Sequence, residues 1–495
     1  MSPNLVRATL WITISEIVFN ISGFIIHAVV GQILGPADYG RYGLVVTLTT
    51  MVIILIGNGI PTAMAKYISE IFETKIGLIK VIKRQAIILQ SLIIGAVTII
   101  FFIASPLIAK ILGDPTLTPL FRISTLIIPA FAAASFYFSY FTGLHKFGIQ
   151  SGLKISRSIL KIIFIIGLAY FWHIEGSIAG YIVAPAIVFL IAFGIDKIFV
   201  DRKIKAEISR SFATAQDDTS FDWKKLVNYA WQIVVFFLAY ELLISIDLYL
   251  VKGILRSDYQ TGIYNASITI GRIPYYLFYA LTVILLPVIS KTTSQDLREE
   301  TSRIINQSLR LMLILLAPSV ILLSVYAKEV MILFFSNKYI DSAYPMSILV
   351  WGVGFLTIFY ILCFIMSGAE KVKKPMVISV IGLIINTLLN YFLIKKYGIA
   401  GSAIATSIAS FFIAIVMLYY IWKDFGVFLH YKTILKIILA GGIIYLVSPF
   451  LPNGKIIFIL SSILLFAAYL IILYILGEIK KQDIAFFKKS IFRNA

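Results

Sequence analysis

Long apolar segments alternate with short polar ones along the whole chain. A helix that crosses a bilayer needs about 20 consecutive apolar residues, whereas a membrane β-strand needs about ten residues of alternating polarity. The apolar runs here are continuous, so they predict helices rather than barrel strands. The pattern predicts fourteen spans: 11–30, 44–60, 86–104, 120–142, 153–171, 177–193, 229–251, 267–289, 309–326, 344–364, 377–394, 402–421, 434–450 and 456–476.

The polar segments between these spans carry unequal positive charge. Of the 43 Lys and Arg residues, 32 fall on the side of the N-terminus, 10 fall on the other side, and Arg272 lies within a span. Positive residues concentrate on the cytoplasmic side of membrane proteins. The asymmetry predicts a multi-pass protein of the cell membrane with both termini in the cytoplasm. It assigns Lys154, Arg157 and Lys161 to the cytoplasmic side, with Lys161 reaching the interface; the alternative for Lys161 is that it faces the cavity.

Composition agrees with a membrane protein. Apolar residues make up 60% of the chain and charged residues 14%, and the mean hydropathy is +0.95. Soluble proteins contain about 45–50% apolar and about 25% charged residues, so soluble enzymes and disordered scaffolds are excluded. The net charge of +19 follows from the basic loops and does not indicate nucleic acid. The single cysteine, Cys363, excludes a disulfide framework and a cysteine-ligated metal cluster.

The two halves of the chain align after a shift of 225 residues. The shift places Gly176 on Gly401, and it places Glu16 on Glu241. Six helices per copy is an even number, so both copies enter the membrane in the same direction. We therefore predict an all-α membrane protein with two parallel six-helix lobes and two extra helices. The predicted parts are an N-terminal lobe (1–195), a cytoplasmic connector (196–222), a C-terminal lobe (223–425), and helices 13 and 14 with a cytoplasmic tail (426–495).

Several short motifs resemble those of one known family. Residues 31–40, GQILGPADYG, resemble the LGPxxYG signature that follows the first helix of polysaccharide-biosynthesis flippases of the O-antigen and exopolysaccharide type. These proteins belong to the multidrug/oligosaccharidyl-lipid/polysaccharide exporter superfamily. Further similar motifs follow in the family's order: AMAKYISE (63–70), GIYNA (262–266), LPVISK (286–291), NTLLN (386–390) and IKKYGIAGSAIAT (394–406). The resemblance implies a V-shaped, alternating-access transporter that moves a polyprenyl-(pyro)phosphate-linked oligosaccharide to the outer leaflet for cell-surface polysaccharide synthesis.

Three polar residues share one face of the first predicted span. Glu16, Asn20 and His27 are spaced i, i+4 and i+11. A charged side chain at mid-bilayer costs roughly 2.5–3.5 kcal/mol, so it usually faces a cavity or a partner. We predict ion coupling, with H⁺ or Na⁺, at Glu16, at its repeat equivalent Glu241 and at Asp247. The alternative is a structural ion pair between Glu16 and a nearby Lys or Arg.

The resemblance also implies a cavity that binds pyrophosphate and sugars. Arg272 lies within the eighth span beside Pro274, a predicted kink, and its planar guanidinium suits phosphate oxygens. We expect Arg41 and Lys252, near the outer rim, to join Arg272 in binding the pyrophosphate. Asparagines could instead hold helices together. The residues predicted to contact sugars are Asn20, Asn265, Asn386 and Asn390, with the rings of Tyr240 and Tyr275.

Other functions fit the sequence less well. A cation-coupled multidrug exporter of the same superfamily would have an acidic, aromatic cavity, whereas the embedded charges here mix acids with Arg272. A lipid-linked peptidoglycan-precursor flippase of the same superfamily is a second alternative. A membrane-embedded transferase would need a catalytic carboxylate pair, and the Asp217-Asp218 pair lies in the low-complexity connector. A polymer-length regulator would carry a large soluble domain.

These comparisons favour a transporter over an enzyme. We expect no cofactor beyond a possible coupled H⁺ or Na⁺, and we expect a monomer. The expected partners are the lipid-linked oligosaccharide, membrane lipids and glycan polymerases or transferases of the same pathway, without nucleic acid.

Overall fold

The computed structural model describes residues 3–57, 59–72, 76–200, 221–427, 431–452, 454 and 456–479. All regular secondary structure within these ranges is helical, which confirms the predicted all-α class. Nine helical segments of the described chain are long and apolar enough to cross a membrane. Each of the fourteen predicted spans lies on one or two of the described helices.

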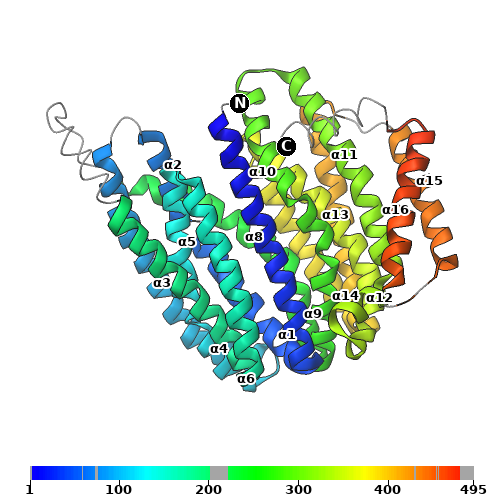
Figure 1. The fold of residues 1–495 in the computed structure, drawn as a ribbon, viewed down its shortest axis with the longest axis horizontal. Helices are drawn as coiled ribbons and strands as arrows, with labels where there is room; N and C mark the ends of the chain where they lie inside the picture. The colour runs from blue at the N-terminus through cyan, green and yellow to red at the C-terminus, as the bar shows by residue number, and fades with distance from the viewer. Residues whose placement is uncertain are drawn as a thin grey trace. The chain divides into compact units, whose positions relative to one another are not determined.

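The chain divides into two compact units, residues 1–265 (unit 1) and 266–495 (unit 2). Unit 1 begins with α1 (Pro3–Gly57), α2 (Ile60–Ile71), α3 (Ile76–Ile111), α4 (Thr118–Ser124), α5 (Ile127–Gly143) and α6 (Phe147–Ile195). It also contains α8 (Lys224–Leu255) and the first part of α9 (Asp258–Gly271). The sequence places α8 in the C-terminal lobe, whereas in the structure α8 packs against α1 and α2 (Figure 1). Residues 201–220 of the predicted connector lie outside the described residues.

Unit 2 contains the remaining helices. In order these are α10 (Ile273–Ser294), α11 (Arg298–Val325), α12 (Ala327–Phe335), α13 (Ala343–Gly368), α14 (Lys373–Phe425), α15 (Tyr431–Val447) and α16 (Ile457–Ile475). Helices α13 and α14 pack most extensively against each other in this unit. The two extra helices, α15 and α16, lie side by side, and both contact α11.

Three helices are too long for a single crossing. Helices α1, α6 and α14 contain 55, 49 and 53 residues, whereas about 20 residues span the bilayer core. Each contains a residue with positive φ, at Gly35 (75°), His173 (45°) and Gly398 (59°). The helix therefore breaks there, and each long helix contains two predicted spans. Gly398 follows His173 by 225 residues, the spacing of the predicted repeat.

The breaks in α6 and α14 also share their packing. A Cβ atom at Gly176 would lie 2.0 Å from the carbonyl oxygen of Leu168, and one at Gly401 would lie 2.0 Å from that of Leu393. No side chain fits at such a distance, so both positions require glycine. The chain therefore folds back on itself in the same way in both units.

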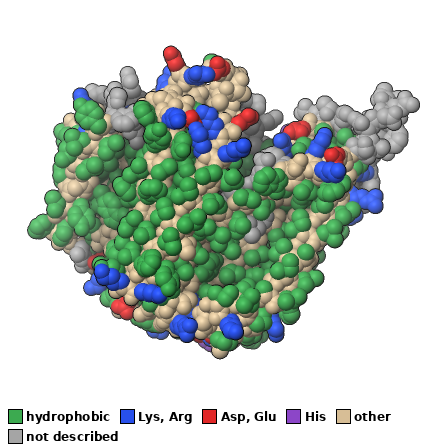
Figure 2. Space-filling model, turned by 180° about the vertical axis from the view of Figure 1, so that it is seen from behind, with side chains coloured by type: hydrophobic (Ala, Val, Ile, Leu, Met, Phe, Trp, Pro, Cys, Tyr) green, Lys and Arg blue, Asp and Glu red, His purple; other side chains and the backbone are tan. Residues whose placement is uncertain are grey.

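The described surface is suited to lipid. Large apolar side chains are widely exposed, among them Ile103 (71%), Leu446 (70%) and Ile475 (75%). On the face drawn in Figure 2, apolar side chains cover the middle, and Lys, Arg, Asp and Glu gather at the upper and lower edges. Apolar patches of this extent mark a membrane or partner surface, which agrees with the predicted membrane spans.

A buried carboxylate fastens α15 and α16 to α11. Glu478, just after α16, accepts hydrogen bonds from Arg310 Nε (2.8 Å), Thr433 Oγ1 (3.0 Å) and Lys436 Nζ (3.3 Å). Burial raises the pKa of Glu478, but these three bonds outweigh that effect and hold the pKa below its usual value. The carboxylate is therefore ionised at neutral pH and joins the extra helices to the rest of unit 2.

Candidate functional site

Three basic side chains lie along one face of α6. Lys154, Arg157 and Lys161 follow the i, i+3, i+7 spacing of a helical face. Arg157 is 4% exposed and Lys161 is 6% exposed. The charge count places all three on the cytoplasmic side, which stays a prediction, but the structure buries Arg157 and Lys161 rather than leaving Lys161 at an exposed interface. The spacing rule that identified Glu16 and Asn20 could also have identified this cluster.

The first member of the cluster is paired with an acid of α1. Lys154 Nζ donates a hydrogen bond to the Glu16 carboxylate. The side chains of Lys154 and Glu16 are 13% and 20% exposed, so the pair is more accessible than the other two cations. This contact favours the structural alternative stated for Glu16, and its coupling role stays a prediction.

The other two cations are surrounded by aromatic rings. The Arg157 guanidinium lies 4.3 Å from the ring centre of Phe131 and 4.6 Å from that of Phe138, and its Nη1 donates to Ser135 Oγ at 3.3 Å. Its Nε has no hydrogen-bond partner among the described residues. Lys161 Nζ lies 4.8 Å from the ring centre of Tyr181. Cation–π contacts of this kind compensate only part of the lost hydration.

The cluster therefore carries more positive than negative charge. Within the described chain, three cations on α6 share a single paired carboxylate, that of Glu16. A buried cation without an anionic partner is costly, so such a group is stabilised when an anion binds. Guanidinium and ammonium groups are the protein's usual phosphate ligands. We refer to Glu16, Lys154, Arg157 and Lys161 as the α6 cluster.

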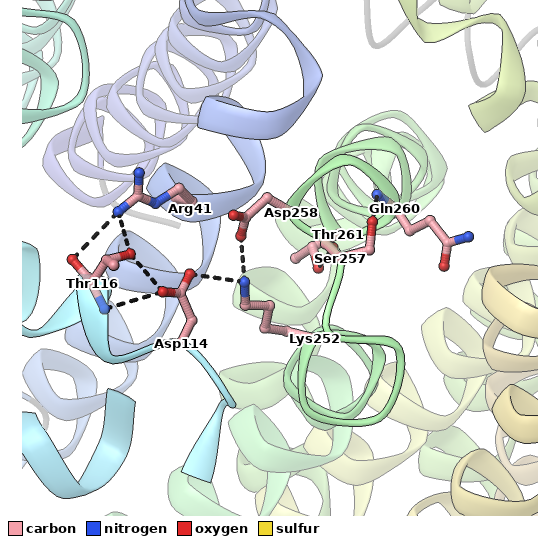
Figure 3. Close-up of polar contacts among 8 residues, drawn as sticks. All are labelled: Arg41, Asp114, Thr116, Lys252, Ser257, Asp258, Gln260 and Thr261. Atoms are coloured by element: carbon pink, nitrogen blue, oxygen red, sulfur yellow. Dashed lines mark hydrogen bonds and ion pairs between the residues drawn. The ribbon is translucent and has the colours of Figure 1, made fainter. Parts of the chain in front are cut away.

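A second set of charged and polar side chains connects α1, α8, α9 and the segment that follows α3 in unit 1 (Figure 3). Lys252, 3% exposed at the end of α8, donates to Asp114 Oδ2 at 3.0 Å and also to Asp258. Arg41 Nη2 donates to Thr116 Oγ1 at 2.9 Å, and the Thr116 amide donates to Asp114 Oδ1 at 3.1 Å. We refer to these five residues as the Lys252 network. Arg41 and Lys252, both predicted to bind pyrophosphate, thus lie together, and Lys252 is compensated by two carboxylates.

Asp114 is held in its ionised form by this network. Partial burial raises the pKa of Asp114, but hydrogen bonds from Thr116 and Lys252 and the charge of Lys252 outweigh that effect and lower the pKa. The ion pairs of the network connect segments that the charge pattern places on one side of the membrane, the side opposite the N-terminus.

Backbone contacts between α1 and α9 adjoin the Lys252 network. A Cβ atom at Gly262 would lie 1.7 Å from the Pro36 carbonyl oxygen, and one at Gly40 would lie 2.4 Å from that of Asp258. Pro36 and Gly40 belong to the GQILGPADYG motif, so the motif's small residues allow this close approach. Asn265, 4% exposed and predicted to contact sugar, lies nearby on α9.

In unit 2 the predicted asparagines bond to one another. Asn390 Nδ2 donates to Asn386 Oδ1 at 2.8 Å, and Ser402 Oγ donates to Asn390 Oδ1 at 2.6 Å. Asn386 and Asn390 are 1% and 0% exposed. The bond from Ser402 to Asn390 and a longer one from Thr406 Oγ1 to Asn386 Oδ1 (3.4 Å) join the two halves of α14 across its break, which favours the helix-joining alternative for both asparagines.

Arg272 lies where the predicted eighth span is interrupted. It is the N-cap residue of α10, and Pro274 occupies the first turn of that helix, the position where proline is best tolerated. The amide of Arg272 still donates to the Ile268 carbonyl at 3.1 Å, and that of Tyr276 to the Arg272 carbonyl at 3.2 Å, so the interruption beside Pro274 is a kink, as predicted. The Tyr275 ring lies 4.9 Å from that of Tyr360.

The remaining predicted residues lie on α1 and α8. Asn20 and Glu241 are half-buried, and Tyr240 is buried. Asp247 is 2% exposed and accepts a hydrogen bond from the Tyr264 hydroxyl at 3.0 Å. The predicted roles of these residues, and of Arg272, in ion coupling or substrate binding stay predictions.

Comparison with known proteins agrees with this architecture. The profile of the family described as "Polysaccharide biosynthesis protein" matches residues 5–293, and the MatE profile matches residues 232–392. The chain is 23% identical over 453 residues to the lipid II flippase MurJ of Bacillus subtilis, covering 82% of this chain and 80% of the relative. It is 26% identical over 296 residues to a putative O-antigen transporter of Shigella flexneri, covering 58% of this chain and 66% of the relative.

A solved structure titled "Lipid II flippase MurJ, inward closed conformation" has a similar fold. The TM-score is 0.76 at 17% identity, over 95% of this chain and 98% of the other. This likeness supports the transporter fold that the motifs imply. The first profile covers more than half of the sequence. The chain therefore belongs to the polysaccharide biosynthesis protein family.

Proposed function

We propose that the protein is a flippase that moves a polyprenyl-(pyro)phosphate-linked oligosaccharide from the inner to the outer leaflet of the cell membrane. The observation that carries this proposal is the excess positive charge of the α6 cluster within a membrane-spanning helix. A substrate whose anionic group must cross the apolar core needs such a cluster on its route. The activities in the names of the relatives support the same class of substrate.

Alternating access requires that each side of the route opens in turn. The Lys252 network would close the outer side, because its segments carry the outward assignment of the charge pattern. On the opposite side, Gln85 Nε2 donates to the Phe221 carbonyl at 2.8 Å, and the fully buried Leu226 at the start of α8 packs in the core of unit 1. Movement of α8 away from α1 and α2 would release either closure.

Two alternatives belong to the same superfamily. The MatE profile match is compatible with a drug exporter, but an excess of buried cations repels a cationic drug. A lipid-linked peptidoglycan precursor carries the same pyrophosphate as the proposed substrate, so it differs only in its sugars. Competition between the two lipid-linked substrates in one transport assay distinguishes these possibilities.

The test uses the purified chain in proteoliposomes that contain a labelled lipid-linked oligosaccharide. Arg157→Ala should lower the flipping rate at least tenfold, and Arg157→Lys should restore part of it, because lysine keeps the charge but lacks the planar fork. Arg298→Gln, at a side chain that is 89% exposed, is the control. Undiminished flipping by a folded Arg157→Ala protein would contradict the proposal.

A further inference from the structure

The Lys154–Glu16 pair is the accessible end of the α6 cluster. Both side chains keep more than a tenth of their surface exposed, whereas Arg157 and Lys161 are nearly inaccessible. An anion that approaches the cluster therefore meets this pair first. At that point the Lys154 ammonium is already occupied by a carboxylate of the protein itself.

We propose that Glu16 is an internal counter-ion of a diphosphate site on α6, and that the diphosphate of the substrate displaces it from Lys154. The inference rests on the proposed function, because it takes the substrate to be anionic. In the empty protein Glu16 occupies part of the site. In the loaded protein the diphosphate takes over Lys154, and its further negative charge compensates Arg157 and Lys161.

The charges of the Glu16 carboxylate and of a diphosphate favour this exchange. One carboxylate leaves the three cations undercompensated, whereas a diphosphate brings at least two negative charges and several acceptor oxygens. The Arg157 Nε, without a hydrogen-bond partner in the described chain, is a donor that the diphosphate or a rearranged side chain could use. Lys154 keeps an anionic partner in both states, so the exchange does not leave its charge uncompensated.

A second ion pair in unit 1 lies outside the α6 cluster. Lys83 donates to Asp196, whose side chain is only 2% exposed, and the ammonium lies 4.2 Å from the ring centre of Tyr140. Here a lysine meets a carboxylate, as in the Lys154–Glu16 pair, but neither residue belongs to the α6 cluster. This pair is therefore the matched control for the Lys154–Glu16 pair.

The experiment measures binding of inorganic pyrophosphate to the full-length protein in nanodiscs by isothermal titration calorimetry. Glu16→Gln removes the competing carboxylate, so it should tighten pyrophosphate binding about tenfold, which corresponds to about 1.4 kcal/mol. Lys154→Gln should weaken it by a similar factor. The double variant Lys83→Gln, Asp196→Asn removes the control pair as a whole and should leave the affinity unchanged.

A second variant covers the possibility that Glu16→Gln fails to fold. Glu16→Asp keeps the charge but withdraws it from Lys154, so it should also tighten binding, by a smaller factor. Thermal unfolding of each variant shows which proteins are folded. Unchanged or weaker pyrophosphate binding by the folded Glu16 variants would overturn the inference.

Flipping assays on the same proteins separate this inference from the proposed function. If pyrophosphate binding depends on Glu16 but lipid-linked oligosaccharide is not moved, the proposed function fails and the counter-ion site stands. If the wild-type protein flips the oligosaccharide but the Glu16 variants bind pyrophosphate with unchanged affinity, only the counter-ion role fails.

Discussion

Helices α6 and α14 have the same backbone construction and different chemistry. Both are broken at positions 225 residues apart, and both fold back over a glycine that no other residue could replace. Yet the three cations of α6 have neutral, buried residues at the equivalent positions of α14. The equivalent pairs are Lys154 with Ser379, Arg157 with Gly382, and Lys161 with Asn386.

This difference separates the demands of the fold from those of the substrate. The return of the chain at each break is fixed by close packing, so both repeats keep it. In α14, Asn386 completes hydrogen bonds with its neighbours within the unit, whereas Lys161 in α6 has aromatic rings around its charge. If the protein has the proposed function, the comparison favours the first repeat as the one that binds the anion of the substrate.

Exchanging the equivalent residues should give the largest and most unequal effects. Asn386→Lys places a cation among buried amides, so we expect a loss of about 3–5 kcal/mol of stability or failure to fold. Lys161→Asn removes a buried charge, so the protein should keep its stability but lose at least nine-tenths of its flipping rate. Thermal unfolding and proteoliposome flipping measure the two effects. Equal destabilisation by both exchanges would contradict the comparison.

Alanine at the two return glycines should give equal effects. The added Cβ atom would lie 2.0 Å from a carbonyl oxygen at Gly176 and at Gly401, so each unit must shift its backbone. We expect Gly176→Ala and Gly401→Ala each to lower the free energy of unfolding by about 1–3 kcal/mol. Gly95→Ala, where a Cβ would meet nothing within 4 Å, is the control. A much smaller loss at one glycine would show that the two returns differ.

The residues with positive φ at the breaks should respond in opposite directions. His173 carries a Cβ at a positive φ (45°), a sparsely populated conformation that costs about 1–3 kcal/mol, whereas Gly398 carries none. His173→Gly removes this cost but gives the unfolded chain more freedom, so the net effect should be a stabilisation of unit 1 by up to about 1 kcal/mol. Gly398→Ala should destabilise unit 2 by a similar amount. Chemical denaturation of both variants, compared with wild type, tests the prediction; destabilisation by His173→Gly would refute it.

Acid should weaken the contacts of Asp114 in unit 1 and of Glu478 in unit 2, with smaller effects on stability than those of the substitutions above. The pKa values of Asp114 and Glu478 are both lowered in the folded protein. Their contributions to stability are therefore present above the ordinary carboxyl pKa of about 4 and are lost as the pH falls through the lowered values. Hydrogen exchange in segments 112–117 and 431–437 should thus accelerate only in acid. Asp114→Asn should abolish the acid response of the first segment alone.

The sequence predicted the helices well, because continuous apolar runs and basic loops follow directly from the bilayer. It also predicted the repeat, because the turns at the two helix breaks need glycine at equivalent positions. It did not show that Arg157 and Lys161 are buried, because a count of loop charges assigns a basic residue to one side of the membrane without saying how exposed it is. It could not reveal that Lys252 meets Asp114, because 138 residues separate them and only tertiary packing brings them together.

The central claim is that α6, and not α14, contacts the anion of the substrate. It is tested most directly by photo-crosslinking the protein with a lipid-linked diphosphate that carries a photoreactive group next to its phosphates. Mass spectrometry of the labelled peptides should place the crosslinks on residues 147–165 and near Glu16, and excess pyrophosphate should suppress them. Crosslinks confined to residues 373–390 would contradict the account.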